Sequence, residues 1–158
     1  MTPNARRGQN RVWRGQIATI TLIFTFLDQG YLLAQPTPLE RAKATIGHTN
    51  HFNHDGANWC ADYVVTMAGE RLPVSPSRSA KQLYQRFKAA GLVVSQPQPG
   101  DLVFFWRESP QSWKGHTGIV EAVSSTTLTT IEGNVGRIVQ RRTYARHAIT
   151  RLLGFGRL

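Results

Sequence analysis

The 158-residue sequence contains only one cysteine, Cys60, so a disulfide within the chain is excluded. It also lacks a long hydrophobic segment: the longest, Ile17–Leu27, has eleven residues, and a transmembrane helix needs about 20. It has no internal repeat, no low-complexity tract and no acidic residue after Glu132. These absences argue against a disulfide-stabilised scaffold, a membrane-spanning helix and a repeat array.

Acidic residues are scarce in the chain as a whole. Nine aspartates and glutamates accompany 19 lysines and arginines, which gives a formal net charge of +10 and a pI near 10.9. Such a charge favours an anionic partner, and nucleic acid, an acidic membrane and an anionic cell-wall polymer all qualify. A basic surface that only keeps the protein soluble remains an alternative. With 41 % apolar residues, the length suits one globular domain with one core.

The N-terminal segment indicates the compartment. Four arginines before residue 15 precede the apolar segment Ile17–Leu27, and Tyr31–Gln35 provides a small residue, Ala34, at a cleavage point. This order is typical of a secretory signal peptide, with an uncleaved anchor or a buried helix as the alternative. We predict that residues 1–34 are a cleaved signal and that residues 35–158 form a secreted or periplasmic domain without stable membrane insertion. The mature part keeps 15 basic and 8 acidic side chains, a net charge of +7.

The cysteine falls in a segment with helical periodicity, Asn58–Gly69. Gly69 is suited to end this helix, and Asn58 is placed to cap its first turn. Cys60 then lies in the first turn, where unpaired N–H groups and the helix dipole favour a thiolate. A lone thiol in an exported protein is either buried and inert or kept for chemistry, and this position favours chemistry. The apolar residues that set the helical period are Ala61, Val64, Val65 and Ala68.

The remaining patterns predict two more helices followed by strands. Helices are expected over Leu39–Ile46 and from Ser77 or Ser79 to Ala90. Six short strands, most joined by brief connections, then indicate an antiparallel sheet. Helices first and strands after make an α+β domain with the helices on one side of the sheet. The expected strands are 92–94, 102–106, 116–123, 127–131, 138–144 and 149–155.

A thiolate nucleophile needs a base, and the base needs a third group that fixes its tautomer. His116 opens a predicted strand, where Gly115 and Gly118 leave space around its ring. Glu132 ends the next strand, and adjacent antiparallel strands bring residues at this separation together. We therefore expect Glu132 to accept a hydrogen bond from one nitrogen of His116 while the other nitrogen faces Cys60. The alternatives are a structural thiol, an ordinary strand histidine and a solvated turn glutamate.

These motifs resemble the CHAP family of cysteine, histidine-dependent amidohydrolases and peptidases, within the papain-like and NlpC-type superfamily. The resemblance rests on the order of the motifs and covers residues 58–134. It implies a papain-like fold, with N-terminal helices packed on a five- or six-stranded antiparallel sheet, and hydrolysis of an amide bond in peptidoglycan. The matching pieces are Trp59-Cys60-Ala61, Pro99-Gly100-Asp101-Leu102-Val103, Gly115-His116-Thr117-Gly118-Ile119-Val120 and Ile131-Glu132-Gly133-Asn134.

The resemblance also implies a role for each matching side chain. Cys60 is expected to be the nucleophile, His116 the general base and then the acid, and Glu132 the group that orients the histidine. Asn134 matches a polar position that helps to hold the histidine or to polarise the site. The backbone N–H of Cys60 is expected in the oxyanion hole. Independently of the resemblance, we expect Asn58 to add a side-chain donor there.

Residues that precede the cysteine are expected to contact the substrate. Trp59 and the loop residue His54 are expected to line the groove together with Asn58. His48, His51 and His54 have zinc-binding side chains, but their spacing fits no single face of a helix or strand, and no cysteine or acidic cluster completes four ligands. The same loop holds a single acid, too few for calcium. We therefore expect no metal and no cofactor.

The predicted function is an exported, monomeric thiol hydrolase of peptidoglycan or another anionic wall polymer. Nucleic acid is not expected as a partner, because the chain has no recognisable nucleic-acid-binding motif. Two alternatives stay open: a catalytically silent, basic wall-binding module of the same fold, and an antibacterial or host-directed thiol amidase. The arginines after Glu132 suit either a solvated face or contact with a phosphate-rich polymer. They are Arg137, Arg141, Arg142, Arg146, Arg151 and Arg157.

Overall fold

The computed structural model describes residues 35–49 and 58–158. The chain divides into two units, Met1–Gln35 and Pro36–Leu158, and the description below concerns the second. The predicted signal peptide, residues 1–34, lies outside the described residues and stays a prediction. Within the described ranges, no helix is both long enough and apolar enough to cross a membrane.

Two of the described helices begin at side chains that cap them. α2, Pro38–Ala44, starts after Thr37, whose hydroxyl accepts from the backbone N–H of Glu40 while the Glu40 carboxylate accepts from the backbone N–H of Thr37. α4, Ala80–Ala89, starts after Ser79, whose hydroxyl caps the first turn. Both helices occupy their predicted segments, with ends that differ by one or two residues.

The helix that carries the cysteine, α3, spans Cys60–Ala68 as the periodicity predicts. Its N-cap residue is Trp59, and no side chain caps the helix, so the predicted capping role of Asn58 is wrong. The helix ends at Gly69, whose φ of +55° lies in the left-handed region that glycine adopts without a steric penalty. Cys60 is therefore the first helical residue, one position after the N-cap.

Six described strands form one sheet in the order β1-β6-β2-β3-β4-β5, and every neighbouring pair is antiparallel. The predicted α+β architecture is therefore confirmed. The strands are β1 (Val93–Val94), β2 (Leu102–Trp106), β3 (Gly115–Val123), β4 (Thr127–Val135), β5 (Ile138–Ala145) and β6 (Leu152–Gly156). The short 3-10 helices η1 (Gly69–Arg71) and η2 (Arg146–Ala148) lie in connections.

β4 is longer than the sequence pattern predicts. It continues past Ile131 to Val135, so Glu132 lies within the strand and not in a turn. The register with β5 shifts between Glu132 and Val135, and Asn134, in this irregular stretch, has a φ of +61°. Such bulges bend a strand and re-aim its side chains. The Asn134 side chain consequently reaches Asn58, just before α3.

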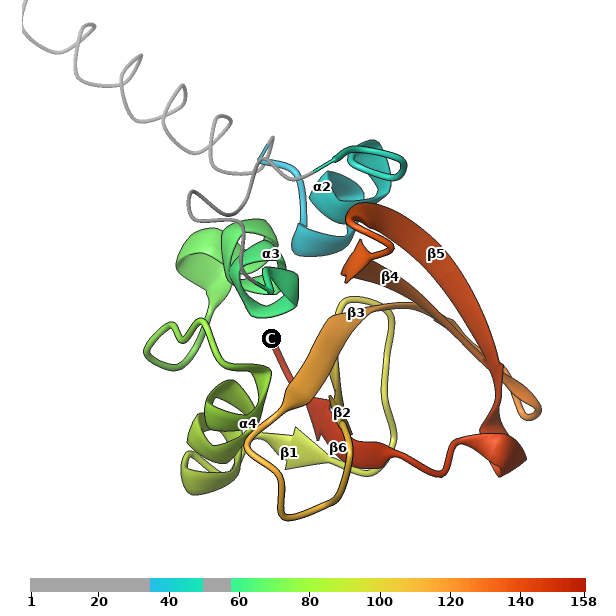
Figure 1. Ribbon diagram of the computed structural model, residues 1–158. Coiled ribbons are helices and arrows are strands. Elements are labelled where there is room, and N and C mark those ends of the chain that lie inside the picture. Colours follow the sequence, from blue (N-terminus) through green and yellow to red (C-terminus); the bar gives the residue numbers. More distant parts are fainter. Residues whose placement is uncertain (1–34, 50–57) are drawn as a thin grey trace, which may run out of the picture. The chain divides into compact units, whose positions relative to one another are not determined.

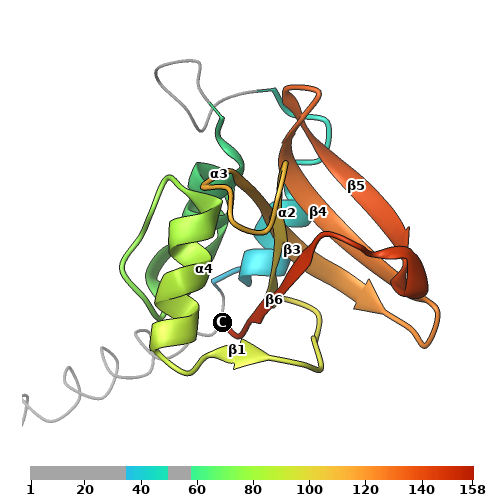
Figure 2. The ribbon, with the colours of Figure 1, turned by 60° about the horizontal axis from the view of Figure 1, so that its bottom comes forward.

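The two faces of the sheet bury different clusters. The three helices gather on one side of a curved sheet (Figures 1 and 2). Side chains alternate between the faces of a strand, and β2 shows this directly. Leu102 and Phe104 point into the core beneath the helices. Val103 and Phe105 belong to a second cluster on the opposite face, which the curved strands and the segment before β6 cover.

Candidate active site

Cys60 lies where the start of α3 packs closely against β4. Its residue surface is 6 % exposed, and the preceding Trp59 is 1 % exposed and packs edge-on against Tyr63 with 6.3 Å between the ring centroids. Gly133 of β4 permits this approach, since a Cβ there would lie 2.6 Å from the Tyr63 Cβ and 2.7 Å from a ring carbon of Trp59. A larger residue at 133 would push the cysteine away from the strand.

His116 stands near the start of β3, on the strand next to that of Glu132. It pairs in register with Phe105 of β2, and the two rings stack with 6.4 Å between their centroids. His116 Nε2 lies 2.8 Å from Glu132 Oε2, which is the contact expected from the sequence. Gly118 makes room for it, because a Cβ at 118 would lie 2.6 Å from the Glu132 Cγ.

Cys60 lies close enough to His116 for the thiol group to help raise the pKa of the imidazole, and both side chains line the same pocket. With Nε2 engaged by Glu132, Nδ1 is the imidazole nitrogen left for the thiol. Cys60, His116 and Glu132 therefore follow one another from the start of α3 across β3 to β4, with a hydrogen bond between the histidine and the glutamate. Each of the three residues is nearly buried, so water competes little for these contacts.

Glu132 has two further donors that the sequence analysis missed. The hydroxyls of Thr130 and Tyr144 donate to Oε1 at 2.6 and 2.7 Å, so both carboxylate oxygens are occupied. Thr130 is two residues before Glu132 on one strand, and this spacing alone could have indicated it. Tyr144 comes from β5, where its register partner is Leu128, so only the folded sheet brings its hydroxyl to Glu132. These donors fix the carboxylate that in turn fixes the imidazole.

His116 and Glu132 each shift the pKa of the other. Burial on its own lowers the pKa of His116, but the hydrogen bonds and charges of Cys60 and Glu132 outweigh it and raise the pKa to about 9. Burial on its own raises the pKa of Glu132, but the hydrogen bond and charge of His116, with the two hydroxyls, lower it below its usual value. At neutral pH the arrangement therefore favours an imidazolium beside a carboxylate.

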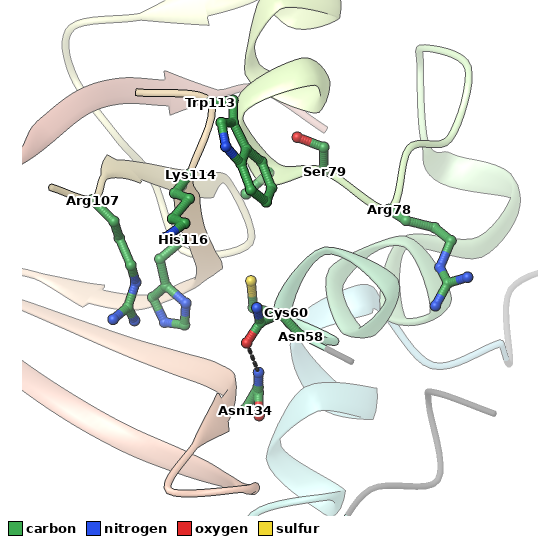
Figure 3. A pocket seen from close by; sticks show the side chains of 11 residues that line it. Asn58, Cys60, Arg78, Ser79, Arg107, Trp113, Lys114, His116 and Asn134 are labelled. Atoms are coloured by element: carbon green, nitrogen blue, oxygen red, sulfur yellow. Dashed lines mark hydrogen bonds between the residues drawn. The ribbon is translucent and has the colours of Figure 1, made fainter. Parts of the chain in front are cut away.

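A pocket of about 170 Å³ opens in front of Cys60 and His116 (Figure 3). Asn134 lies on its wall and donates from Nδ2 to Oδ1 of Asn58 at 3.2 Å. Within the described part of the chain, Asn134 makes no hydrogen bond to His116, so its geometry fits polarisation of the site better than support of the imidazole. The other lining residues are Arg78, Ser79, Ala80, Arg107, Trp113, Lys114 and Gly115.

The structure corrects one expected substrate contact. Trp59 belongs to the core beneath the helices and does not line the pocket, because its ring fills the space that Gly133 leaves. The tryptophan on the pocket is Trp113, which is 73 % exposed. His54, the other predicted contact beside Asn58, lies outside the described residues.

The metal prediction rests on the same loop. His51 and His54 lie outside the described residues, and His48 is described. Across residues 35–49 and 58–158, no group of three or more histidine, cysteine, aspartate or glutamate side chains is placed to hold a metal ion. The described site therefore offers acid, base and thiol groups, and no ligand set for a metal.

Comparisons with solved structures place this fold among known ones. Ly7917, solved with the hydrolyzing product of MDP, aligns with a TM-score of 0.57 at 19 % identity, over 75 % of this chain and 60 % of that one. PlyC aligns with a TM-score of 0.55 at 18 % identity, over 95 % of this chain and 43 % of that one. This chain thus spans less than two thirds of either structure. No curated protein sequence matches it.

A comparison with family models gives the clearest result. The model described as CHAP domain matches residues 52–134, just over half of the chain. The matched range contains Cys60, His116, Glu132 and Asn134, the four residues that the resemblance singled out. The chain belongs to the CHAP domain family.

Proposed function

We propose that this CHAP-family protein is an exported peptidoglycan hydrolase that cleaves an amide bond through a covalent intermediate on Cys60. The observation that carries the proposal is the chain of contacts from Cys60 through His116 to Glu132, at the wall of an open pocket. Nucleophile, base and orienting group are the parts that thiol catalysis of acyl transfer requires.

The first half-reaction is acylation. The raised pKa of His116 keeps the imidazole protonated at neutral pH, and this charge stabilises a Cys60 thiolate beside it. The thiolate attacks the carbonyl carbon of the substrate amide, a C–S bond forms and the carbonyl oxygen becomes an oxyanion. His116 then gives its proton to the amide nitrogen, the C–N bond breaks and the amine leaves.

The second half-reaction is hydrolysis of the thioester. Neutral His116 removes a proton from a water molecule, whose oxygen attacks the acyl carbon. The C–S bond breaks, the carboxylic acid product leaves, and the thiolate–imidazolium pair is restored. Glu132 accepts from Nε2 throughout, so Nδ1 remains the nitrogen that exchanges protons with substrate and water.

The oxyanion is expected to bind donors at the start of α3. The backbone N–H of Cys60 belongs to the first turn, and such groups have no partner within their helix. Because Oδ1 of Asn58 accepts from Asn134, the Asn58 amide group faces the pocket with its Nδ2 donors available. Asn58 and Asn134 would then act together, one donating to the oxyanion and the other fixing its partner.

Peptidoglycan is proposed as the substrate on three grounds. The family is that of cysteine, histidine-dependent amidohydrolases, the related fold of Ly7917 was solved with the hydrolyzing product of MDP, a peptidoglycan fragment, and the mature chain carries a net charge of +7. The signal-like N-terminus would deliver such an enzyme to the wall. An anionic wall polymer and a cationic enzyme attract each other.

The test is digestion of purified peptidoglycan by the chain and by its Cys60→Ala variant. We expect the intact protein to release amines, and mass spectrometry of the fragments to identify the bond, whereas the variant releases none. Release by both proteins would remove Cys60 from the mechanism. No release by either, with equal sedimentation of both with the wall, would establish a silent binding module instead.

A further inference from the structure

A second pocket lies on the other side of His116 from the thiol. It has a volume of about 270 Å³, and its wall includes His116 and Glu132 but not Cys60. Phe105, Tyr144 and the segment between η2 and β6 complete the wall, so this pocket belongs to the sheet face opposite the helices. Arg107 lines both pockets, and Figure 3 shows its side chain near His116.

The second pocket is strongly cationic. Arg107, Arg142 and Arg151 line it, and no carboxylate in the described ranges forms an ion pair with any of them. The single acid on its wall, Glu132, is 1 % exposed, and both of its oxygens already accept hydrogen bonds. The positive charge of these arginines is therefore available to a ligand or to a group outside the described part of the chain.

Aromatic rings hold two of these arginines in place. The guanidinium of Arg142 lies 5.4 Å from the ring centroid of Tyr144, and that of Arg151 lies 5.5 Å from the ring centroid of Trp106. Stacked guanidinium groups keep their N–H edges free for in-plane acceptors, and a carboxylate matches that edge with two parallel hydrogen bonds. The pocket is thus preorganised for a carboxylate.

The position of His116 decides which half of the substrate enters this pocket. In the proposed reaction the Cys60 sulfur bonds to the acyl carbon while His116 passes a proton to the departing nitrogen. The amine half must therefore lie on the histidine's side of the scissile bond, and the acyl half on the side of Cys60. The second pocket contacts the histidine and not the cysteine, and it shares Arg107 with the first pocket, so a leaving half whose nitrogen meets Nδ1 in the first pocket continues past Arg107 into the second.

We propose that the arginine-lined pocket is the leaving-group subsite and that it selects amines carrying a carboxylate, that is, acidic peptides. The proposal rests on the proposed function for the direction of the reaction. The balance of the step is unchanged: the C–N bond breaks, His116 supplies the proton, and the protonated or neutral amine departs with its carboxylate still paired to arginine. Selection is then for the peptide beyond the cleaved bond.

The first experiment compares two synthetic substrates of the bond identified in the peptidoglycan digest. Their leaving halves are identical except that one carboxyl is free in the first and amidated in the second. We expect kcat/KM to be about tenfold higher for the free carboxyl at low salt, and the preference to shrink as ionic strength rises. Arg142→Gln combined with Arg151→Gln should reduce the preference to below about twofold.

The control variants separate charge from structure. Arg142→Lys keeps a charge and should retain part of the preference. Arg141→Gln alters the neighbouring residue, whose side chain pairs with Glu121 (2.8 Å from Nη2 to Oε1) and does not line the pocket, so its preference should equal that of the wild type. If the Arg142 and Arg151 variants lower kcat/KM equally for both substrates, the arginines act on folding or on Glu132. That result would overturn their role in selecting a carboxylate.

A binding measurement decides the proposal even if no substrate is cleaved. Calorimetry of the Cys60→Ala protein should detect binding of the peptide Ala-Glu-NH2, and the affinity for Ala-Gln-NH2 should be at least about tenfold lower. Adding Arg142→Gln should remove this difference in affinity. Hydrolysis through Cys60 with equal rates for both carboxyl states would sink the subsite and leave the function intact. Carboxylate-dependent binding without any hydrolysis would support the arginine-lined binding site and contradict the proposed enzymatic function.

Discussion

Two buried carboxylates, Asp101 and Glu132, belong to the motifs that resemble the family, and they have different hydrogen-bond partners. Glu132 is 1 % exposed and Asp101 is 3 % exposed. Glu132 faces the imidazole of His116 and two hydroxyls. Asp101 accepts from Nε of Arg157 at 2.7 Å and from the backbone N–H of Gln98 at 2.8 Å. Both are fully hydrogen-bonded, so burial alone does not tell a reactive carboxylate from a structural one.

The partner and its surroundings make the difference. The Asp101–Arg157 pair ties the turn before β2 to the residue that follows β6. Arginine in general is not a group that exchanges protons in proteins. A histidine changes its charge within reach of physiological pH, and His116 also opens onto two pockets. The Pro99-Gly100-Asp101 motif therefore supports the fold, and the Glu132 region is the one to which the proposed function gives proton transfer.

The largest effect expected from this comparison is that of Glu132→Gln on activity. The amide either donates to His116 Nε2, which moves the imidazole proton to the side of Cys60, or forces the two hydroxyls to reverse. We expect kcat to fall about 10²- to 10⁴-fold with little change in KM. Steady-state kinetics on peptidoglycan fragments measure this fall in kcat, with Asp101→Asn as the matched control. Equal losses of kcat in the two variants would contradict the distinction between a reactive and a structural carboxylate.

The second prediction concerns the pH dependence of stability. The folded pKa of His116 is raised from 6.5 to about 9, so the stability it contributes is complete below pH 6.5 and is lost as the pH rises through 9. The folded pKa of Glu132 is lowered, so its contribution is present above its usual 4.5 and is lost as the pH falls. The pair therefore stabilises most between pH 4.5 and 6.5.

Thermal unfolding of the wild type and of His116→Gln across this range checks the prediction. The wild type should lose on the order of 1–3 kcal/mol between pH 6.5 and 9.5 that the variant does not lose. Asp101→Asn should lower Tm by the same amount at both pH values, because no histidine takes part in the ion pair that it removes. A wild-type curve parallel to that of His116→Gln would contradict the charged pair.

Asp101→Asn itself should destabilise the fold without touching catalysis. It removes the charge that pairs with Arg157 but keeps an acceptor for Gln98, so we expect a loss of about 1–2 kcal/mol in the free energy of unfolding. Activity per folded molecule, from urea denaturation combined with active-site titration of Cys60, should stay within about twofold. A large fall in activity of folded molecules would give the motif a catalytic role.

The smallest effect is expected at the pair Arg141–Glu121, in which the arginine is exposed. The Arg141 side chain is 51 % exposed and that of Glu121 is 11 % exposed, and ion pairs at the surface contribute less than about 1 kcal/mol. Arg141→Gln should therefore change the unfolding free energy by less than that amount, and the change should shrink further in 0.5 M salt. A loss of unfolding free energy as large as that of Asp101→Asn would mean that solvent exposure does not determine how much these ion pairs contribute to stability.

The basic surface shows how a composition argument changes once partners are visible. Among the six arginines after Glu132, Arg141 and Arg157 are in ion pairs and Arg146 donates to the backbone carbonyl of Ser124. Arg142 and Arg151 stack on aromatic rings at the second pocket. The sequence showed only a row of positive charge, and the structure divides five of its six arginines into intramolecular links and a pocket lining.

The elements of the fold and the order of the reactive residues were readable from the sequence. Helix starts depend on local caps and periodicity, so α4 and the position of Cys60 in the first turn of α3 followed from neighbouring residues. His116 and Glu132 could be paired because adjacent antiparallel strands constrain which residues meet. These interactions are short in sequence or fixed by sheet geometry.

Packing between distant segments was not readable. Trp59 is in the core and not in the groove because Gly133, more than 70 residues later, leaves space for its ring. Tyr144 reaches Glu132 from β5 although its register partner on β4 is Leu128, and Arg107 lines two pockets only once β2 and β3 are paired. Sequence determined which groups the chain has and which segments carry them; tertiary structure decided which groups meet, because register shifts and close packing depend on atoms that no local pattern contains.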